Sequence, residues 1–258
     1  MPEPTYALIT GASSGIGECF ARALAARQRN LVLVARSADR LEALAAELRS
    51  HHGILAEPLP SDLAASGAAA ALAARLGEKR LSVDLLVNNA GFGARGEFLK
   101  LPLDRQSEMV DLNVRALIEL THFLARPMME RRAGAIINVA STASFQAVPY
   151  TTLYSATKAL VLSFSLGLAE ELRPYSVTVV TLCPGGTQTN FFKASGYGRP
   201  NMLGSLQLPE EVAAAGLRAL ERGGGLVVPR LLNKAMVFVQ RLVPRGLPVK
   251  MAARMFRP

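Results

Sequence analysis

Short apolar segments alternate with helix-length segments along most of the chain, and this alternation restricts the fold more than any other feature. Strands are predicted at Tyr6–Thr10, Leu31–Ala35, Ile54–Leu59, Leu85–Asn88, Ala135–Ala140, Val177–Leu182 and Leu226–Val228. Helices are predicted at about Ile16–Arg29, Ala38–His51, Ala64–Leu76, Asp104–Arg131, Thr151–Arg173 and Pro209–Arg222. Continuous apolar strands are typical of parallel sheets that helices cover on both faces. The pattern therefore predicts an α/β fold, a doubly wound parallel sheet of about seven strands.

The length of the chain is consistent with one domain. Its 258 residues, half of them hydrophobic, predict a single domain over residues 1–258 with a basic and apolar C-terminal tail at 231–258. No stretch of about 18 uninterrupted apolar residues is found, and the first residues do not resemble a signal peptide. We therefore expect a cytoplasmic protein. The two cysteines and three histidines show no metal-ligand spacing, so no metal site is expected.

The net charge of +9 is concentrated at the end of the sequence. After Glu221 there are eight Lys or Arg residues and no acidic residue, whereas the first 221 residues hold 21 basic and 20 acidic side chains. A nucleic-acid-binding protein more often carries its positive charge over the body or along a recognition helix. We therefore expect no nucleic-acid partner.

A glycine-rich loop follows the first predicted strand and leads into the first predicted helix. Gly11, Gly15 and Gly17 would allow a tight turn and a close approach of the backbone to a pyrophosphate, which the helix N-terminus also favours. A strand-to-helix turn without a ligand is the alternative for this loop taken alone. Its strand, loop and helix context favours dinucleotide binding.

The end of the second predicted strand indicates which dinucleotide binds. Folds that bind NAD place an acidic residue there to hold the ribose 2′-hydroxyl, but this chain has Ala35 and Arg36. A guanidinium pairs with a 2′-phosphate, which a carboxylate would repel. NADP(H) is therefore expected in preference to NAD(H), with an exposed, solvated Arg36 as the alternative.

Tyr154 and Lys158 are the strongest candidates for catalysis. Residues four apart share one face of a helix, so the lysine ammonium can favour the tyrosine phenolate. A cation about 4 Å away at an effective dielectric of about 20 is worth up to ~4 kcal/mol, which would bring a phenol pKa from about 10 toward neutrality. Ser141 lies thirteen residues before the tyrosine. Taken alone, each of these residues could equally be a surface or turn residue.

Several motifs occur in an order that resembles the short-chain dehydrogenase/reductase family. They are Thr10–Gly17, Asp62-Leu63, Asn88–Gly91, Asn113, Ser141, Tyr154–Lys158 and Pro184–Thr189. The resemblance runs from Tyr6 to about Val228. It implies catalytic roles for four residues: Tyr154 as general acid in reduction, Ser141 bonding the substrate oxygen, Lys158 holding the nicotinamide ribose, and Asn113 supporting a water that resupplies the proton.

The same resemblance implies the cofactor contacts. Asp62 and Leu63 would meet the adenine, Asn89 and Ala90 the adenosine ribose, and Thr187 and Thr189 the nicotinamide. The remaining expected contacts are Gly11, Ser13, Ser14, Gly15, Ile16, Gly17, Arg36, Tyr154, Lys158, Pro184 and Gly185.

The segments expected near the nicotinamide are largely apolar: Phe92–Ala94, Phe145–Pro149 and Phe191-Phe192. They favour an uncharged, hydrophobic carbonyl or alcohol substrate, and the nearby cations Arg95, Lys193 and Arg199 are interpreted as solvated loop charges. We expect an NADP(H)-dependent oxidoreductase acting on a hydrophobic ketone, aldehyde or 3-oxoacyl-like compound, in a homodimer or homotetramer. The alternative is a non-catalytic NADP-binding regulator or scaffold, which would not need Asn113, Ser141, Tyr154 and Lys158 together.

The tail after Arg230 departs most from the family pattern. On a helix it would place Leu231, Leu232, Ala235, Met236, Val239, Leu242 and Val243 on one face, with Lys234 and Arg241 opposite. Contact with an anionic membrane surface is one interpretation. Packing over the active site or a subunit interface is favoured, because Val237 and Phe238 interrupt the polar face.

Overall fold

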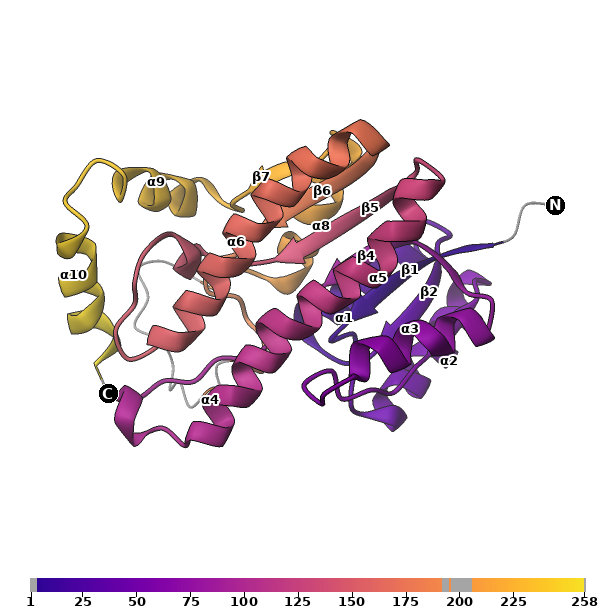
Figure 1. The fold of residues 1–258 in the computed structure, drawn as a ribbon, viewed down its shortest axis with the longest axis horizontal. Helices are drawn as coiled ribbons and strands as arrows, with labels where there is room; N and C mark the ends of the chain where they lie inside the picture. The colour runs from indigo at the N-terminus through magenta and orange to yellow at the C-terminus, as the bar shows by residue number, and fades with distance from the viewer. Residues whose placement is uncertain (1–3, 192–194, 196–205, 258) are drawn as a thin grey trace.

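A computed structural model describes residues 4–191, 195 and 206–257. Its seven strands form one parallel sheet in the order β3-β2-β1-β4-β5-β6-β7, and Figure 1 shows this sheet with helices around it. Their bounds are β1 Thr5–Thr10, β2 Asn30–Val34, β3 Ala56–Pro58, β4 Ser82–Asn88, β5 Gly134–Val139, β6 Val177–Leu182 and β7 Gly225–Val227. The prediction of a doubly wound parallel sheet is confirmed.

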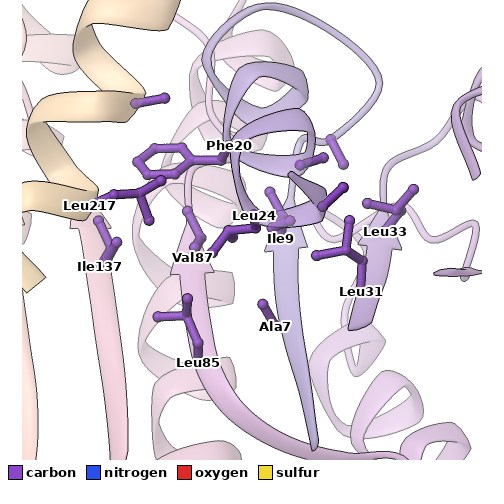
Figure 2. Close-up of a cluster of buried hydrophobic side chains, with 14 of the residues drawn as sticks. Ala7, Ile9, Phe20, Leu24, Leu31, Leu33, Leu85, Val87, Ile137 and Leu217 are labelled. Carbon is purple, nitrogen blue, oxygen red and sulfur yellow. The ribbon is translucent and has the colours of Figure 1, made fainter. Parts of the chain in front are cut away.

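Helices cover both faces of the sheet, and their bounds are α1 Gly15–Ala25, α2 Ala38–His52, α3 Ala68–Glu78, α4 Leu103–Val110, α5 Ala116–Glu130, α6 Thr152–Leu172, α8 Pro209–Glu221, α9 Leu231–Val239 and α10 Gly246–Phe256. Helices α1, α2 and α8 pack on one face, and α3, α5 and α6 on the other. Strand side chains alternate between the two faces, which gives two cores: Ile9 belongs to the cluster that also holds Phe20, Leu24 and Leu217 (Figure 2), and its neighbour Leu8 faces the opposite core.

The single helix predicted over Asp104–Arg131 is wrong in one respect. Helix α4 ends at Val110, a π-helical turn covers Asp111–Arg115, and α5 begins at Ala116. Hydrophobic spacing alone did not indicate this turn, because a π-turn inserts one residue without changing the apolar character of either side. It carries Asn113, one of the predicted catalytic residues. Such turns are frequent at functional sites.

Helix α6 is apolar along most of its length. Among the described residues, the stretch Thr152–Tyr175 alone is long and apolar enough to cross a membrane by length and composition. In this fold one side of it packs on the sheet, with Val161 and Ser165 fully buried. Leu160 and Leu166 lie on its exposed side.

Candidate active site

The carboxyl ends of β1 and β4 meet at the point where the strand order reverses, between β3-β2-β1 and β4 onward. Thr10 joins the two ends, since its Oγ1 accepts hydrogen bonds from the backbone N–H groups of Asn89 and Ala90, both at 2.9 Å. The Asn89 amide nitrogen donates to the Thr10 carbonyl at 2.9 Å. Ligands of open α/β sheets bind in the crevice at such a switch point.

The glycine loop is pressed against its surroundings so closely that side chains would not fit. A Cβ on Gly17 would lie 2.3 Å from the carbonyl oxygen of Gly11, and one on Gly11 would lie 2.8 Å from the amide nitrogen of Asn89. Gly15 has a φ of +58° and faces the Thr189 side chain. The loop therefore needs glycine for packing as well as for conformation. It leaves the N-terminus of α1 open toward the cavity.

Arg36 follows the end of β2 and remains largely exposed. Its side chain is 62% exposed, and its Nη1 lies 3.4 Å from the Glu108 carboxylate on α4. Glu108 also accepts a 2.6 Å hydrogen bond from Arg105. Arg40, on the first turns of α2, lines the same part of the cavity as Arg36. Arg40 was not predicted as a site residue, although it lies only four residues after Arg36 in the sequence.

Lys158 is buried on α6, with only 5% of its surface exposed. Its Nζ donates a 2.8 Å hydrogen bond to the carbonyl of Val139, at the end of β5. Burial lowers the pKa of the Lys158 ammonium to about 8, an effect that the nearby Cys183 thiol partly opposes. Tyr154, one turn earlier, lies beside Phe191, with ring centroids 5.4 Å apart. The lysine therefore keeps a positive charge at neutral pH next to the tyrosine.

Asn113 is buried in the π-helical turn, and its side chain is fully engaged. Its Oδ1 accepts from the backbone N–H of Phe92 at 3.0 Å, and its Nδ2 donates to the Phe92 carbonyl at 2.9 Å and to Thr157 at 3.2 Å. A Cβ on Gly91 would lie 2.8 Å from the Asn113 Oδ1. The asparagine thus fixes the loop after β4 against α6.

Ser141 caps the short 3₁₀ turn Thr142–Phe145 that follows β5. Its Oγ accepts the backbone N–H of Ala143 at 3.1 Å, which leaves the hydroxyl proton available to a substrate oxygen. Ser144, which the sequence analysis did not single out, donates to the Lys158 carbonyl at 2.8 Å and so joins this turn to α6. Ser141 and Lys158 are therefore held in register by one neighbouring serine.

One cavity of about 860 Å³ brings these residues together. Every predicted catalytic and cofactor residue lines it except Gly17 and Asn113, which lie behind the loops that they position. The apolar wall near Tyr154 includes Phe92, Val148 and Phe191. Phe145 points elsewhere and packs beside a core cluster with Val161, whereas Phe192, Lys193 and Arg199 lie outside the described residues.

The C-terminal helices α9 and α10 line one end of the cavity. Six of their residues line it, and Gln240 just after α9 lines it as well; the six are Leu232, Asn233, Met236, Val237, Met255 and Phe256. The interpretation of Arg95 as a solvated loop charge is wrong, because its guanidinium donates to the carbonyls of Phe256 at 2.9 Å and Arg257 at 2.6 Å. Arg95 therefore fastens the end of α10 across the cavity, a contact between residues too distant in sequence for any pattern to indicate.

Comparisons with known proteins agree with this geometry. A family model described as short chain dehydrogenase matches residues 5–199. The ketoacyl reductase HetN of Nostoc sp. is 33% identical over 244 residues, covering 92% of this chain and 84% of that protein. The structure of a short-chain dehydrogenase from Sphingobium yanoikuyae in complex with NADPH is 34% identical, covers 95% of this chain and 97% of its own, and has a TM-score of 0.83.

A second solved structure is similar to a comparable degree. The bulky-bulky ketone specific alcohol dehydrogenase from Comamonas testosteroni is 31% identical, with a TM-score of 0.79 over 95% of this chain and 97% of its own.

Proposed function

The chain belongs to the short-chain dehydrogenase/reductase family, oxidoreductases that bind a nicotinamide dinucleotide and act on small carbonyl or alcohol compounds. We propose that the protein is a carbonyl reductase or alcohol dehydrogenase that prefers NADPH. Its substrate is a bulky hydrophobic ketone, an aldehyde or a 3-oxoacyl-like compound. The observation that carries the proposal is a buried lysine one helical turn from Tyr154, in the cavity that Ser141 and the glycine loop also line.

The residues of the cavity fit the cofactor. The glycine loop leaves room for a pyrophosphate at the N-terminus of α1, where helix dipole and backbone N–H groups favour an anion. At the other end Arg36 and Arg40 supply two guanidinium groups for a 2′-phosphate, and no carboxylate follows β2 at positions 35–37. Asp62 and Leu63 line the cavity beside them and are assigned to the adenine. When bound, the nicotinamide supplies or accepts the hydride.

The chain itself handles the proton and the substrate oxygen. Ser141 Oγ, already an acceptor from Ala143, donates to the carbonyl oxygen and orients it. Tyr154 Oη gives its proton to that oxygen in reduction, and the Lys158 charge stabilises the resulting phenolate. Asn113 is assigned a positioning role, because its side-chain amide is occupied by Phe92 and Thr157. Any support of a water then falls to its backbone.

The substrate class rests on the walls around this centre. Phe92, Val148 and Phe191 on one side and Leu232 and Met236 on the other are apolar. Such a wall suits a bulky uncharged group beside the carbonyl. The names of the similar proteins, a ketoacyl reductase and a bulky-ketone alcohol dehydrogenase, support the same class.

A substrate screen tests the proposal. Purified protein is incubated with NADPH or NADH and a panel of ketones and aldehydes of increasing chain length and bulk, and cofactor absorbance is followed. We expect NADPH consumption with a kcat/KM that rises with apolar bulk. NADPH binding without turnover of any carbonyl, and without oxidation of the matching alcohols by NADP, would favour the non-catalytic regulator instead.

We also propose a homo-oligomer that pairs through the outer faces of α5 and α6. Ile118, Phe123, Leu160 and Leu166 are each 37–42% exposed on these two helices, which pack on the same face of the sheet. Burying such side chains is favourable by about 25 cal/mol per Å² of apolar surface. Light scattering of Phe123→Glu with Leu160→Glu should give a smaller particle than wild type, whereas Leu55→Glu, far from this face, should not.

A further inference from the structure

Helix α9 has two different faces. Its inner face, with Asn233, Met236 and Val237, lines the cavity. Its outer face carries Leu231, Ala235, Phe238 and Leu242 at spacings of four, three and four, which is one helical stripe continued into the following turn. Leu231 is 82% exposed, Phe238 60% and Leu242 69%. The sequence pattern predicted a single apolar face that includes Leu231 and Leu242, with Val237 on the polar side. In the structure Leu231 and Leu242 face outward, and Val237 is buried.

Helix α10 repeats this arrangement. Leu247 and Met251, four residues apart, are 49% and 59% exposed. Lys250 and Arg254, also four apart, run beside them as a basic stripe. Figure 1 shows α9 and α10 together at one side of the molecule, beyond the sheet. Each helix thus presents apolar side chains flanked by cations, away from the cavity that its other side closes.

The charges on these helices are not compensated by the protein. Of the basic residues after Glu221, Arg230 forms an ion pair with Glu211 at 2.9 Å. Within the described part of the chain, the five basic residues between Leu231 and Phe256 form no ion pair or side-chain hydrogen bond: Lys234, Arg241, Arg245, Lys250 and Arg254. A cluster of unpaired cations beside exposed Leu, Phe and Met side chains is complementary to an anionic and partly apolar partner.

We propose that the outer faces of α9 and α10 dock on an anionic lipid membrane surface. We define this C-terminal face by Leu231, Ala235, Phe238, Leu242, Leu247 and Met251 with Lys234, Arg241, Arg245, Lys250 and Arg254. Apolar side chains of interfacial helices enter the boundary between headgroups and acyl chains, while Lys and Arg remain among anionic headgroups. A second copy of the chain is a poorer partner, because it would bring two cationic faces together.

The first experiment measures binding of the intact protein to vesicles. Co-sedimentation is compared between vesicles of phosphatidylcholine alone and vesicles that also contain phosphatidylglycerol. We expect binding to the phosphatidylglycerol vesicles only, and release at 1 M salt, where the screening length falls to ~3 Å. No sedimentation with anionic vesicles at low salt would overturn the proposal.

Charge variants separate the C-terminal face from net charge in general. Lys250→Gln with Arg254→Gln should reduce partitioning about thirtyfold, since each basic residue near such a surface contributes ~1 kcal/mol. The control, Lys100→Gln with Arg173→Gln, removes the same charge from 73% and 78% exposed side chains on the body of the molecule. If both double variants lost vesicle partitioning equally, the attraction to the membrane would depend on net charge alone. That result would contradict a defined docking face.

Apolar variants separate a membrane from an acidic protein. Phe238→Ser with Leu242→Ser should reduce partitioning by at least about tenfold, because both side chains would leave the acyl boundary. Leu55→Ser with Leu99→Ser removes exposed leucines elsewhere and should change nothing. Equal binding of wild type and the Phe238/Leu242 variant to vesicles, or stronger wild-type binding to polyglutamate than to vesicles, would refute the membrane assignment.

Two further measurements keep the result interpretable. None of Phe238, Leu242, Lys250 and Arg254 lines the cavity, so all variants should retain the thermal midpoint of wild type and its turnover of a short, soluble ketone. Vesicle binding does not require turnover. The membrane proposal can therefore fail while the proposed enzymatic function holds, and the reverse is also true. Concentration-dependent self-association that Phe238→Ser abolishes would identify a second copy as the occupant and overturn the proposal.

Discussion

The two ends of the cavity are built in different ways. At the sheet end, around Asn113 and Lys158, buried polar groups are hydrogen-bonded across several elements: β5 to α6 by Lys158, and the loop after β4 to the π-turn by Asn113. At the C-terminal end the wall consists of two short helices with exposed outer faces. Arg95 fastens the second helix through its terminal carbonyls.

This difference has a functional consequence. A proton donor needs a fixed position and a fixed electrostatic environment, which buried and satisfied hydrogen bonds provide. Selection among bulky substrates needs a cavity wall that can adjust its shape. A wall with few buried contacts has low local stability and can therefore move. We therefore expect changes at the sheet end to alter the chemical step, and changes at the C-terminal end to alter substrate affinity and membrane binding.

The largest effect is expected for Tyr154→Phe. It should lower kcat by about 10² to 10⁴ and leave NADPH affinity nearly unchanged, since the ring still packs against Phe191. Steady-state kinetics and fluorescence titration of NADPH measure the two quantities. Tyr175→Phe, which removes the same atom from a partly exposed tyrosine outside the cavity, is the control. A variant that keeps more than about a tenth of wild-type kcat would show that another group supplies the proton.

The second effect concerns the pH dependence of stability at Lys158. Burial lowers the pKa of Lys158 from 10.5 to about 8, so between these values the unfolded chain binds a proton that the folded protein has released. The free energy of unfolding should therefore rise with pH across this window, by about 3 kcal/mol at 1.36 kcal/mol per pKa unit. Below about pH 8 Lys158 is charged in the folded protein too, so this rise in the free energy of unfolding is absent.

Urea unfolding of wild type and Lys158→Met at several pH values isolates this contribution. The difference between the two should grow in favour of wild type from pH 8 to pH 10.5. Lys79→Met, at a half-exposed lysine paired with Glu57, should show no such trend. If the difference in free energy of unfolding between wild type and Lys158→Met did not change with pH, the Lys158 ammonium would not be desolvated in solution.

The third effect concerns cofactor choice at the sheet end. Arg36→Ala should lower NADPH affinity about ten to a hundredfold, because a charge-assisted hydrogen bond is worth roughly 1.5 to 3 kcal/mol, and should leave NADH affinity unchanged. Arg27→Ala removes a guanidinium that pairs with Glu221 away from the cavity and serves as control. Glu108→Gln releases Arg36 from its ion pair and should strengthen NADPH binding modestly. Equal losses for both cofactors in Arg36→Ala would exclude a 2′-phosphate contact.

The sequence predicted the sheet end far better than the C-terminal end, and for a physical reason. Three of its patterns are local in sequence: the strand periodicity, the glycine loop and the Tyr154–Lys158 spacing. Each can be recognised without knowing which distant segments it contacts. The contact of Arg95 with Phe256 joins residues 161 positions apart, and the exposed sides of α9 depend on where the cavity lies. Val237, expected to interrupt a polar face, is buried because that side of the helix meets the body.

The smallest effect is expected for Arg95→Gln, and it tests the C-terminal end directly. Glutamine is too short to reach the carbonyls of both Phe256 and Arg257, so α10 loses hydrogen bonds worth about 1 kcal/mol each. A looser wall should raise KM for a bulky ketone about fivefold to tenfold. The kcat for a small aldehyde should not change, because Arg95 does not line the cavity and the proton donor is held from the sheet side.

Arg132→Gln is the matched control for this test. Its guanidinium also donates to a backbone carbonyl, that of Pro174 at 2.6 Å, but at a site far from the cavity. It should leave both KM values as in wild type. If Arg95→Gln instead lowered kcat equally for small and bulky substrates, the two ends of the cavity would be mechanically coupled. The C-terminal helices would then take part in positioning the reacting groups, and the division between a fixed catalytic end and an adjustable wall would fail.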